Sequence, residues 1–142
     1  MKVFLGGTCG SSTWRSELMP QLDSSIEAYN PVVPNWTPEC RKIEDDHKEN
    51  DDIVLFVITP ETKSPYSISE ITRFSIVCPK RTVVCVLPEA NGMVFEAHEA
   101  QAWDKILKDI SQDGTTVCAN LEEVAKHLNT LSLSKQNQPG QN

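Results

Sequence analysis

The sequence predicts an α/β fold: a doubly wound, flavodoxin- or Rossmann-like sheet of five parallel strands with helices on both faces. Short apolar runs alternate with segments of helical periodicity, and the links between them are short. Residues 53–58 are apolar at six consecutive positions, which is typical of a strand covered on both faces. Because ligands of such sheets bind beyond the carboxyl ends of the strands, we expect the functional residues on the loops at that edge.

The chain opens with a strand, a loop and a helix. Residues 2–5 form an apolar run that ends in a glycine-rich stretch, and Trp14 and Leu18 then recur at helical spacing. A second brief strand is expected at 26–29, since Asn30 and the proline after it break the run.

The second helix and the central strand carry the clearest local signals. Thr37, Pro38 and Glu39 supply a cap, a proline at the first helical position and an early negative charge, so a helix is expected from there to about Asn50. Few of its residues are apolar, and most of this helix should face water or a polar cleft. The run 53–58 follows as the central strand.

The third helix is expected to begin at Ser67, because Ser67 and Glu70 form an S-x-x-E capping box. Pro79 should stop it, and residues 81–87 form the fourth strand. A fourth helix is expected around Trp103.

The chain ends with a fifth strand at 115–118 and a last helix at 121–131. We therefore expect one domain over residues 1–131. The remaining tail, 132–142, is rich in Gln, Asn, Pro and Gly and is expected to be disordered.

Composition argues against several classes of protein. There is no stretch of 18 apolar residues and no signal-peptide pattern, so we expect no membrane span and a cytoplasmic location. A formal charge of −7 works against binding to a nucleic acid polymer, although one pocket can still hold a free nucleotide. Five cysteines at irregular spacings fit reduced thiols better than disulfides or a zinc site, so neither a metal nor a cofactor is expected.

Glu70 is the first candidate for chemistry, because it follows the loop that leaves the central strand. A carboxylate at that edge can attack an anomeric carbon, with a second acid to protonate the leaving group. The alternative is that Glu70 only completes the capping box, and spacing alone favours that role. Five carboxylates between positions 44 and 52 can supply the second acid, although such a group is more often a solvated helix face.

Loop residues are candidates for substrate binding. The glycine-rich stretch is compatible with a sugar or an anion, yet neither common phosphate-binding glycine pattern is present. Trp36 and Tyr66 are candidates for stacking on a nucleobase. Cys9 acting as a thiol nucleophile, with His47 or His98 as base, is a distant alternative, because nothing in the sequence brings a histidine beside it.

Four segments, taken in order, resemble the nucleoside 2-deoxyribosyltransferase-like family, which also has nucleotide N-hydrolase relatives. They are VFLGGTCGSSTWR, YNPVVPNWTPE, NDDIVLFVITP and YSISEI. The resemblance covers about the first 90 residues. It implies a small-molecule nucleoside or nucleotide as substrate, and a homo-oligomer in which a neighbouring subunit completes the pocket.

The resemblance also implies roles for single residues. Glu70 matches the family's nucleophile, and Asp52 matches an aspartate at the start of the third strand. Glu44 or Asp46 would contact the sugar or assist the base. With the loop residues included, the candidate binding set is Gly7, Thr8, Cys9, Arg15, Asn30, Trp36, Tyr66 and Ser67.

The sequence thus predicts that Glu70 attacks C1′, releases the base and forms a glycosyl-enzyme that a second base or water resolves. One alternative is a nucleotide-binding module without catalysis, which the changed approach to Glu70, residues 63–67, would suit. Another is a glycohydrolase of NAD-like dinucleotides. We expect Glu70→Gln to abolish base release and to leave the fold intact, because loss of an exposed cap costs only about 1 kcal/mol.

Overall fold

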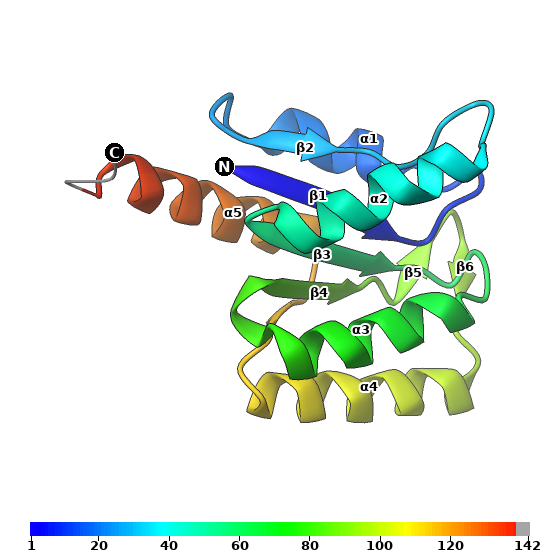
Figure 1. The fold of residues 1–142 in the computed structure, drawn as a ribbon. Coiled ribbons are helices and arrows are strands. Elements are labelled where there is room, and N and C mark those ends of the chain that lie inside the picture. Colours follow the sequence, from blue (N-terminus) through cyan, green and yellow to red (C-terminus); the bar gives the residue numbers. More distant parts are fainter. Residues whose placement is uncertain (139–142) are drawn as a thin grey trace.

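The computed structural model describes residues 1–138 and contains one main sheet (Figure 1). Its strands are β1 (Lys2–Gly7), β2 (Glu27–Tyr29), β3 (Ile53–Ile58), β4 (Thr82–Val86) and β7 (Thr116–Cys118). They are all parallel and lie in the order β2-β1-β3-β4-β7. The predicted doubly wound sheet of five parallel strands is therefore confirmed.

Helices cover both faces of this sheet (Figure 1). They are α1 (Trp14–Leu18), α2 (Pro38–Asn50), α3 (Pro65–Val77), α4 (Ala97–Gln112) and α5 (Leu121–Gln136), with short 3₁₀ turns η1 (Met19–Gln21) and η2 (Pro79–Arg81). Trp14 of α1 and Leu128 of α5 belong to the buried cluster on one face. Ile71 of α3 and Trp103 of α4 belong to the cluster on the other. Helix α2 buries none of its residues, so the sheet is covered less closely there.

The central strand β3 matches its prediction at both ends, and all six of its residues are buried. Its alternate side chains enter the two core clusters: Leu55 lies in one and Phe56 in the other. Full burial of such side chains stabilises the fold by roughly 1.5–3 kcal/mol each. This burial holds the apolar run in the centre of the sheet, between two polar segments.

Strand β1 is two residues longer than predicted, because Gly6 and Gly7 continue the pairing opposite Phe56 and Val57. Gly7 has a φ of 111°, and a Cβ at this position would lie 2.0 Å from the carbonyl oxygen of Val57. Only glycine fits there. The glycine-rich stretch thus brings bare backbone to the carboxyl edge of the sheet.

Helix α3 begins at Pro65, with Ser64 as the residue before it, so the predicted capping box is wrong. Proline at the first helical position has its φ already fixed for a helix and starts α3 one turn earlier than the S-x-x-E spacing suggests. Ser67 and Glu70 consequently lie inside the helix. The capping role that competed with chemistry for Glu70 is removed, whereas the prediction for α2, with Thr37 as its cap, is confirmed.

Helix α5 continues to Gln136, five residues past the expected domain boundary. Ser132 is buried and shares a hydrogen bond of 2.7 Å with Ser25, and Lys135 forms an ion pair with Asp52. These contacts hold residues 132–136 in the helix, in place of a disordered tail. Residues 139–142 of that predicted tail lie outside the described residues.

A small hairpin of β5 (Glu89–Ala90) and β6 (Met93–Val94) was not among the predicted elements. Asn91 and Gly92 form its turn with φ values of 51° and 75°. Asn-Gly is the commonest signature of such a two-residue turn, so the signal was present in the sequence. No helix within residues 1–138 has both the length and the hydropathy needed to cross a membrane.

Candidate active site

A pocket of about 330 Å³ opens beside the carboxyl end of β1, bounded by the loop after β2 and by α2 and α3. The chain leaves β1 for the face covered by α1 and leaves β3 for the opposite face, and a crevice forms where neighbouring strands diverge in this way. We call it the edge pocket. Its lining residues are Phe4, Gly6, Gly7, Cys9, Arg15, Pro31, Val32, Val33, Trp36, Glu44, Lys48, Tyr66, Ser67 and Glu70.

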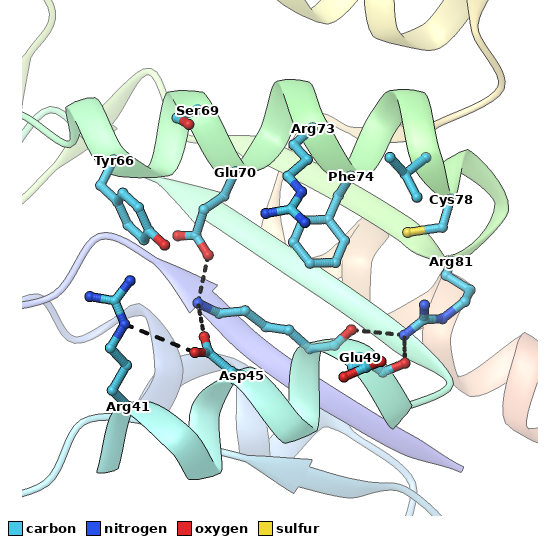
Figure 2. Close-up of a pocket in the computed structure, with 12 residues that line it drawn as sticks. Arg41, Asp45, Glu49, Tyr66, Ser69, Glu70, Arg73, Phe74, Cys78 and Arg81 are labelled. Carbon is cyan, nitrogen blue, oxygen red and sulfur yellow. Dashed lines mark hydrogen bonds and ion pairs between the residues drawn. The ribbon is translucent and has the colours of Figure 1, made fainter. Parts of the chain in front are cut away.

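A second, larger cavity of about 600 Å³ lies between α2 and α3 (Figure 2). We call it the interhelix cavity. Tyr66 and Glu70 lie at one end of it, and Cys78 and Arg81 lie at the other. It shares Lys48, Tyr66 and Glu70 with the edge pocket, so these three side chains form the boundary between the two spaces.

Glu70 is held by one ion pair at this boundary. Its Oε2 lies 2.6 Å from Nζ of Lys48, and both side chains are only 12% exposed. A dashed line at Glu70 marks this ion pair in Figure 2. Oε2 is buried and accepts no hydrogen bond of good geometry from residues 1–138, so the ion pair with Lys48 is its one polar contact there. Oε1 accepts no hydrogen bond from residues 1–138, which leaves that oxygen available to a bound molecule.

Lys48 is the main site residue that the sequence interpretation missed. Its ammonium lies 5.5 Å from the ring centre of Phe4 and 5.7 Å from that of Tyr66. It also lies 4.0 Å from the exposed carboxylate of Asp45, an interaction that solvent screens. The available signal was the spacing of Glu44 and Lys48, since residues four apart share one face of a helix.

Of the predicted acids, Glu44 lines the edge pocket together with Glu70. Asp46 does not: it is exposed on α2 and lines neither cavity. Residues two apart on a helix point in different directions, so Glu44 and Asp46 cannot both face the pocket. Only Glu44 is in a position to serve as the second acid.

Asp52 lies away from this site, because it directly precedes β3 and therefore stands at the amino edge of the sheet. Its Oδ2 accepts the backbone N–H of Lys2 at 2.8 Å, and its Oδ1 lies 2.5 Å from Nζ of Lys135. Partial burial acts to raise the pKa of Asp52, but the hydrogen bonds from Lys135 and Lys2 outweigh it and lower that pKa. The structure does not bring Asp52 to Glu70.

Six of the eight predicted binding residues line the edge pocket: Gly7, Cys9, Arg15, Trp36, Tyr66 and Ser67. Thr8 does not, because it is fully buried and its Oγ1 accepts the backbone N–H of Thr59. Asn30 does not line it either. Its side-chain oxygen accepts the backbone N–H of Val32 at 3.0 Å, which shapes the loop after β2.

Arg15 places a positive charge at the buried side of the edge pocket. Its guanidinium donates to the carbonyl oxygens of Leu5 and Thr8 at 3.0 and 2.8 Å. Burial lowers the pKa of Arg15, although the nearby Cys9 and Glu44 act in the opposite direction. Since the carbonyl partners are neutral, the charge remains available to attract a polar or anionic group of a ligand.

Two aromatic rings stand at the mouth of the pocket. Trp36 is 58% exposed in the loop after β2, and Tyr66 is 60% exposed at the start of α3. Large aromatic side chains that remain this exposed beside a pocket are suited to stacking on a flat ligand. Their arrangement agrees with the predicted contact to a nucleobase.

The thiols of the chain do not form a nucleophile with a histidine. Cys9 is exposed and contacts the carbonyl oxygen of Gly7 and the guanidinium of Arg15. His47 stacks on Tyr29 and bonds to the carboxylate of Asp51. Within residues 1–138 no group of three or more His, Cys, Asp or Glu residues is arranged to hold a metal ion.

Comparison with known families gives one match. Residues 1–90 match the sequence profile of a family described as "Nucleoside 2-deoxyribosyltransferase like". The matched segment contains every residue of the edge pocket, whereas α4, β7 and α5 lie outside it. No curated protein sequence matches the chain at a significant level.

Proposed function

The chain belongs to the nucleoside 2-deoxyribosyltransferase-like family, and we propose that it cleaves the N-glycosidic bond of a nucleoside or nucleotide with Glu70 as nucleophile. Family membership supports a nucleoside-related transferase in general terms. The observation that supports the finer proposal is that Glu70, which has one oxygen without a polar partner within residues 1–138, lines a pocket of about 330 Å³ together with Glu44. A ligand cavity of this size accommodates a nucleoside.

The proposed reaction has two steps. Oε1 of Glu70 bonds to C1′ as the bond from C1′ to the base nitrogen breaks, and Glu44 donates a proton to the departing base. A second base or a water molecule then attacks C1′, gives its proton to the carboxylate of Glu44 and releases Glu70 as a carboxylate. Transfer and hydrolysis differ only in that second step.

The remaining pocket residues suit the two parts of a nucleoside. Trp36 and Tyr66 offer their exposed rings to the base. Gly7 offers backbone without a side chain, and Arg15 offers a positive charge to a hydroxyl or phosphate group. Thus the base would lie toward the pocket mouth and the sugar toward the sheet edge.

The test is an assay of the purified chain with a panel of nucleosides, 5′-nucleotides and NAD, each with and without an added free base. Separation of the products reports the substrate and distinguishes transfer from hydrolysis. Glu70→Gln should release no base, while the exposed Asp46→Asn should match the wild type. Base release that survives in Glu70→Gln contradicts the proposal, and nicotinamide release from NAD alone redirects it to a dinucleotide glycohydrolase.

One observation favours a second candidate, a nucleotide-binding module without catalysis. Lys48 already neutralises the carboxylate of Glu70, and an ion pair of this kind is also a common structural element. Thermal unfolding with each nucleotide separates the two functions. A raised midpoint without any released base supports the binding module.

We also propose that the active form is a homo-oligomer. Val32, Val33 and Trp36 are exposed apolar residues beside the pocket, and a neighbouring subunit would cover them and complete its wall. Light scattering during gel filtration measures the mass directly. A monomer with full activity contradicts this part of the proposal.

A further inference from the structure

The two carboxylate oxygens of Glu70 have different surroundings. Oε2 is buried and lies 2.6 Å from Nζ of Lys48, whereas Oε1 has no polar partner within residues 1–138, and Glu70 lines the edge pocket. A nucleophilic carboxylate needs one oxygen aimed at the substrate and the other held, because free rotation would exchange them. The ion pair provides that distinction.

Lys48 is itself held from both ends. Its ammonium lies near the rings of Phe4 and Tyr66, and its side chain is 12% exposed. Its backbone carbonyl accepts a hydrogen bond of 2.9 Å from Arg81, which also bonds to the carbonyl oxygens of Glu49 and Asp51 at the end of α2. The last turn of α2 is therefore fixed by η2, and this fixes the backbone from which the Lys48 side chain reaches Glu70.

We propose that Lys48 is a positioning residue for Glu70, which holds Oε2, directs Oε1 to C1′ and favours the release of the carboxylate from the glycosyl-enzyme. This inference rests on the proposed function and names a residue that the reaction requires in addition to the nucleophile. Lys48 acts through Glu70 and does not touch the substrate's reacting atoms.

The charge on Glu70 changes in opposite directions in the two steps. When Oε1 bonds to C1′ and the base leaves with its bonding electrons and a proton, the carboxylate becomes a neutral ester and loses its attraction to Lys48. When the acceptor bonds to C1′ and gives its proton to the carboxylate of Glu44, the electrons of the C1′–Oε1 bond return to Glu70 and the negative charge reappears beside the ammonium. In a site with little water, such a fixed charge acts strongly on the step that develops the opposite charge.

Lys48 should therefore matter most for breakdown of the intermediate. Replacement by Met removes the charge, so the ester should break down more slowly and the glycosyl-enzyme should accumulate. Steady-state turnover should fall on the order of 10²-fold, the effect of removing one electrostatic stabiliser from an active site. A merely structural loss of activity would lower turnover without any accumulated adduct.

The experiment measures turnover by base release and the fraction of enzyme carrying a glycosyl group by intact mass spectrometry during turnover. Lys48→Met and Lys48→Gln should both raise that fraction, and Lys48→Arg should restore the wild-type fraction. Lys42→Met is the matched control, since Lys42 lies exposed on the same helix and lines neither cavity. It should behave as the wild type.

If Lys48→Met does not fold, Lys48→Gln remains informative, because it keeps a hydrogen-bond donor without the charge. Three outcomes overturn the inference. An unchanged adduct fraction in the folded variants shows that Lys48 does not act on the second step, while wild-type activity leaves the proposed function standing. Wild-type turnover in Lys48→Gln also overturns the role of Lys48 and leaves the proposed function standing. A wild-type enzyme that releases no base from any substrate overturns both proposals.

Discussion

The two edges of the sheet each carry one carboxylate paired with one lysine. At the amino edge Asp52 lies 2.5 Å from Lys135, and at the carboxyl edge Glu70 lies 2.6 Å from Lys48. The side chains of the first pair are 37% and 44% exposed, and those of the second are 12% exposed. Asp52 also accepts a backbone N–H, whereas the second oxygen of Glu70 has no polar partner within residues 1–138 and Glu70 lines a pocket. A carboxylate–lysine pair thus joins a helix to the sheet at the amino edge, whereas the more buried pair leaves one oxygen of Glu70 for the reaction proposed above.

The largest expected difference between the two edges is in activity. Glu70→Gln should lower the rate of base release by at least about 10⁴-fold, because loss of a nucleophile removes the chemical step. Asp52→Asn keeps its shape and lies away from the pocket, so its rate should stay within about twofold of the wild type. Steady-state assays of both variants at saturating substrate check the difference. A large loss in Asp52→Asn would mean that the amino edge takes part in catalysis.

The second expected difference is in stability. Lys48→Met leaves a nearly buried carboxylate without its partner and should lower the free energy of unfolding by about 3 kcal/mol. Lys135→Met breaks an exposed pair and should lower it by less than about 1 kcal/mol. Urea unfolding of both variants measures the two values, and equal losses would show that burial does not distinguish the pairs. The same reasoning corrects our expectation for Glu70→Gln. This variant breaks a nearly buried ion pair, so its loss in the free energy of unfolding should exceed the loss expected for an exposed helix cap.

The fold was largely predictable from the sequence because its strongest signal, the run Ile53–Ile58, allows only a strand buried on both faces. The start of α3 was not predicted correctly. Pro65 and the S-x-x-E pattern suggest different first residues, and the helix begins at the proline. The extension of α5 depends on contacts between Ser132 and Ser25 and between Lys135 and Asp52. Such contacts join residues more than 80 positions apart, and no local pattern reports them.

The site residues placed by the order of the strands were predictable, whereas those placed by contacts between side chains of different helices were not. Glu70 and Trp36 come after the carboxyl ends of β3 and β2, and Gly7 is the last residue of β1, so the sheet order brings them together. Asp52 directly precedes a strand, and a parallel sheet puts that position at the opposite edge. Lys48 was missed because its role depends on a partner in another helix.

A third expected effect concerns Glu61, which joins three loops at the carboxyl edge. Its carboxylate accepts hydrogen bonds from Ser12 at 2.6 Å, from Thr59 at 2.9 Å and from Asn91 at 2.7 Å. Glu61→Gln should lower the free energy of unfolding by about 1–2 kcal/mol, because it weakens several bonds to a charged acceptor. It should also raise the KM, since Ser12 follows the glycine-rich stretch of the edge pocket. An unchanged KM would show that these loops do not shape the pocket.

Acidification should have a related effect on Glu61. The hydrogen bond from Ser12 lowers its pKa, partial burial opposes this, and Asn91 and Thr59 lower the pKa further. A carboxyl group whose pKa is lowered by folding contributes stability above its unfolded pKa of about 4.3 and loses it as the pH falls through the folded value. Protection factors in the three loops, which correct for the intrinsic pH dependence of hydrogen exchange, should therefore fall below that pH in the wild type and should be low at every pH in Glu61→Gln.

The smallest expected effect is the acid sensitivity of the Asp52 pair. The hydrogen bonds from Lys135 and Lys2 lower the pKa of Asp52 despite its partial burial, so this pair stabilises the fold fully above the unfolded pKa of about 3.9. The stabilisation is lost as the pH falls through the lower, folded pKa. Because the pair is exposed, the loss should be less than about 1 kcal/mol and should shrink in high salt. The urea midpoint of Asp52→Asn should lie below that of the wild type at neutral pH, and the two midpoints should converge at low pH. If the variant instead loses base release at acid pH, the two edges communicate and the amino edge is more than an attachment for α5.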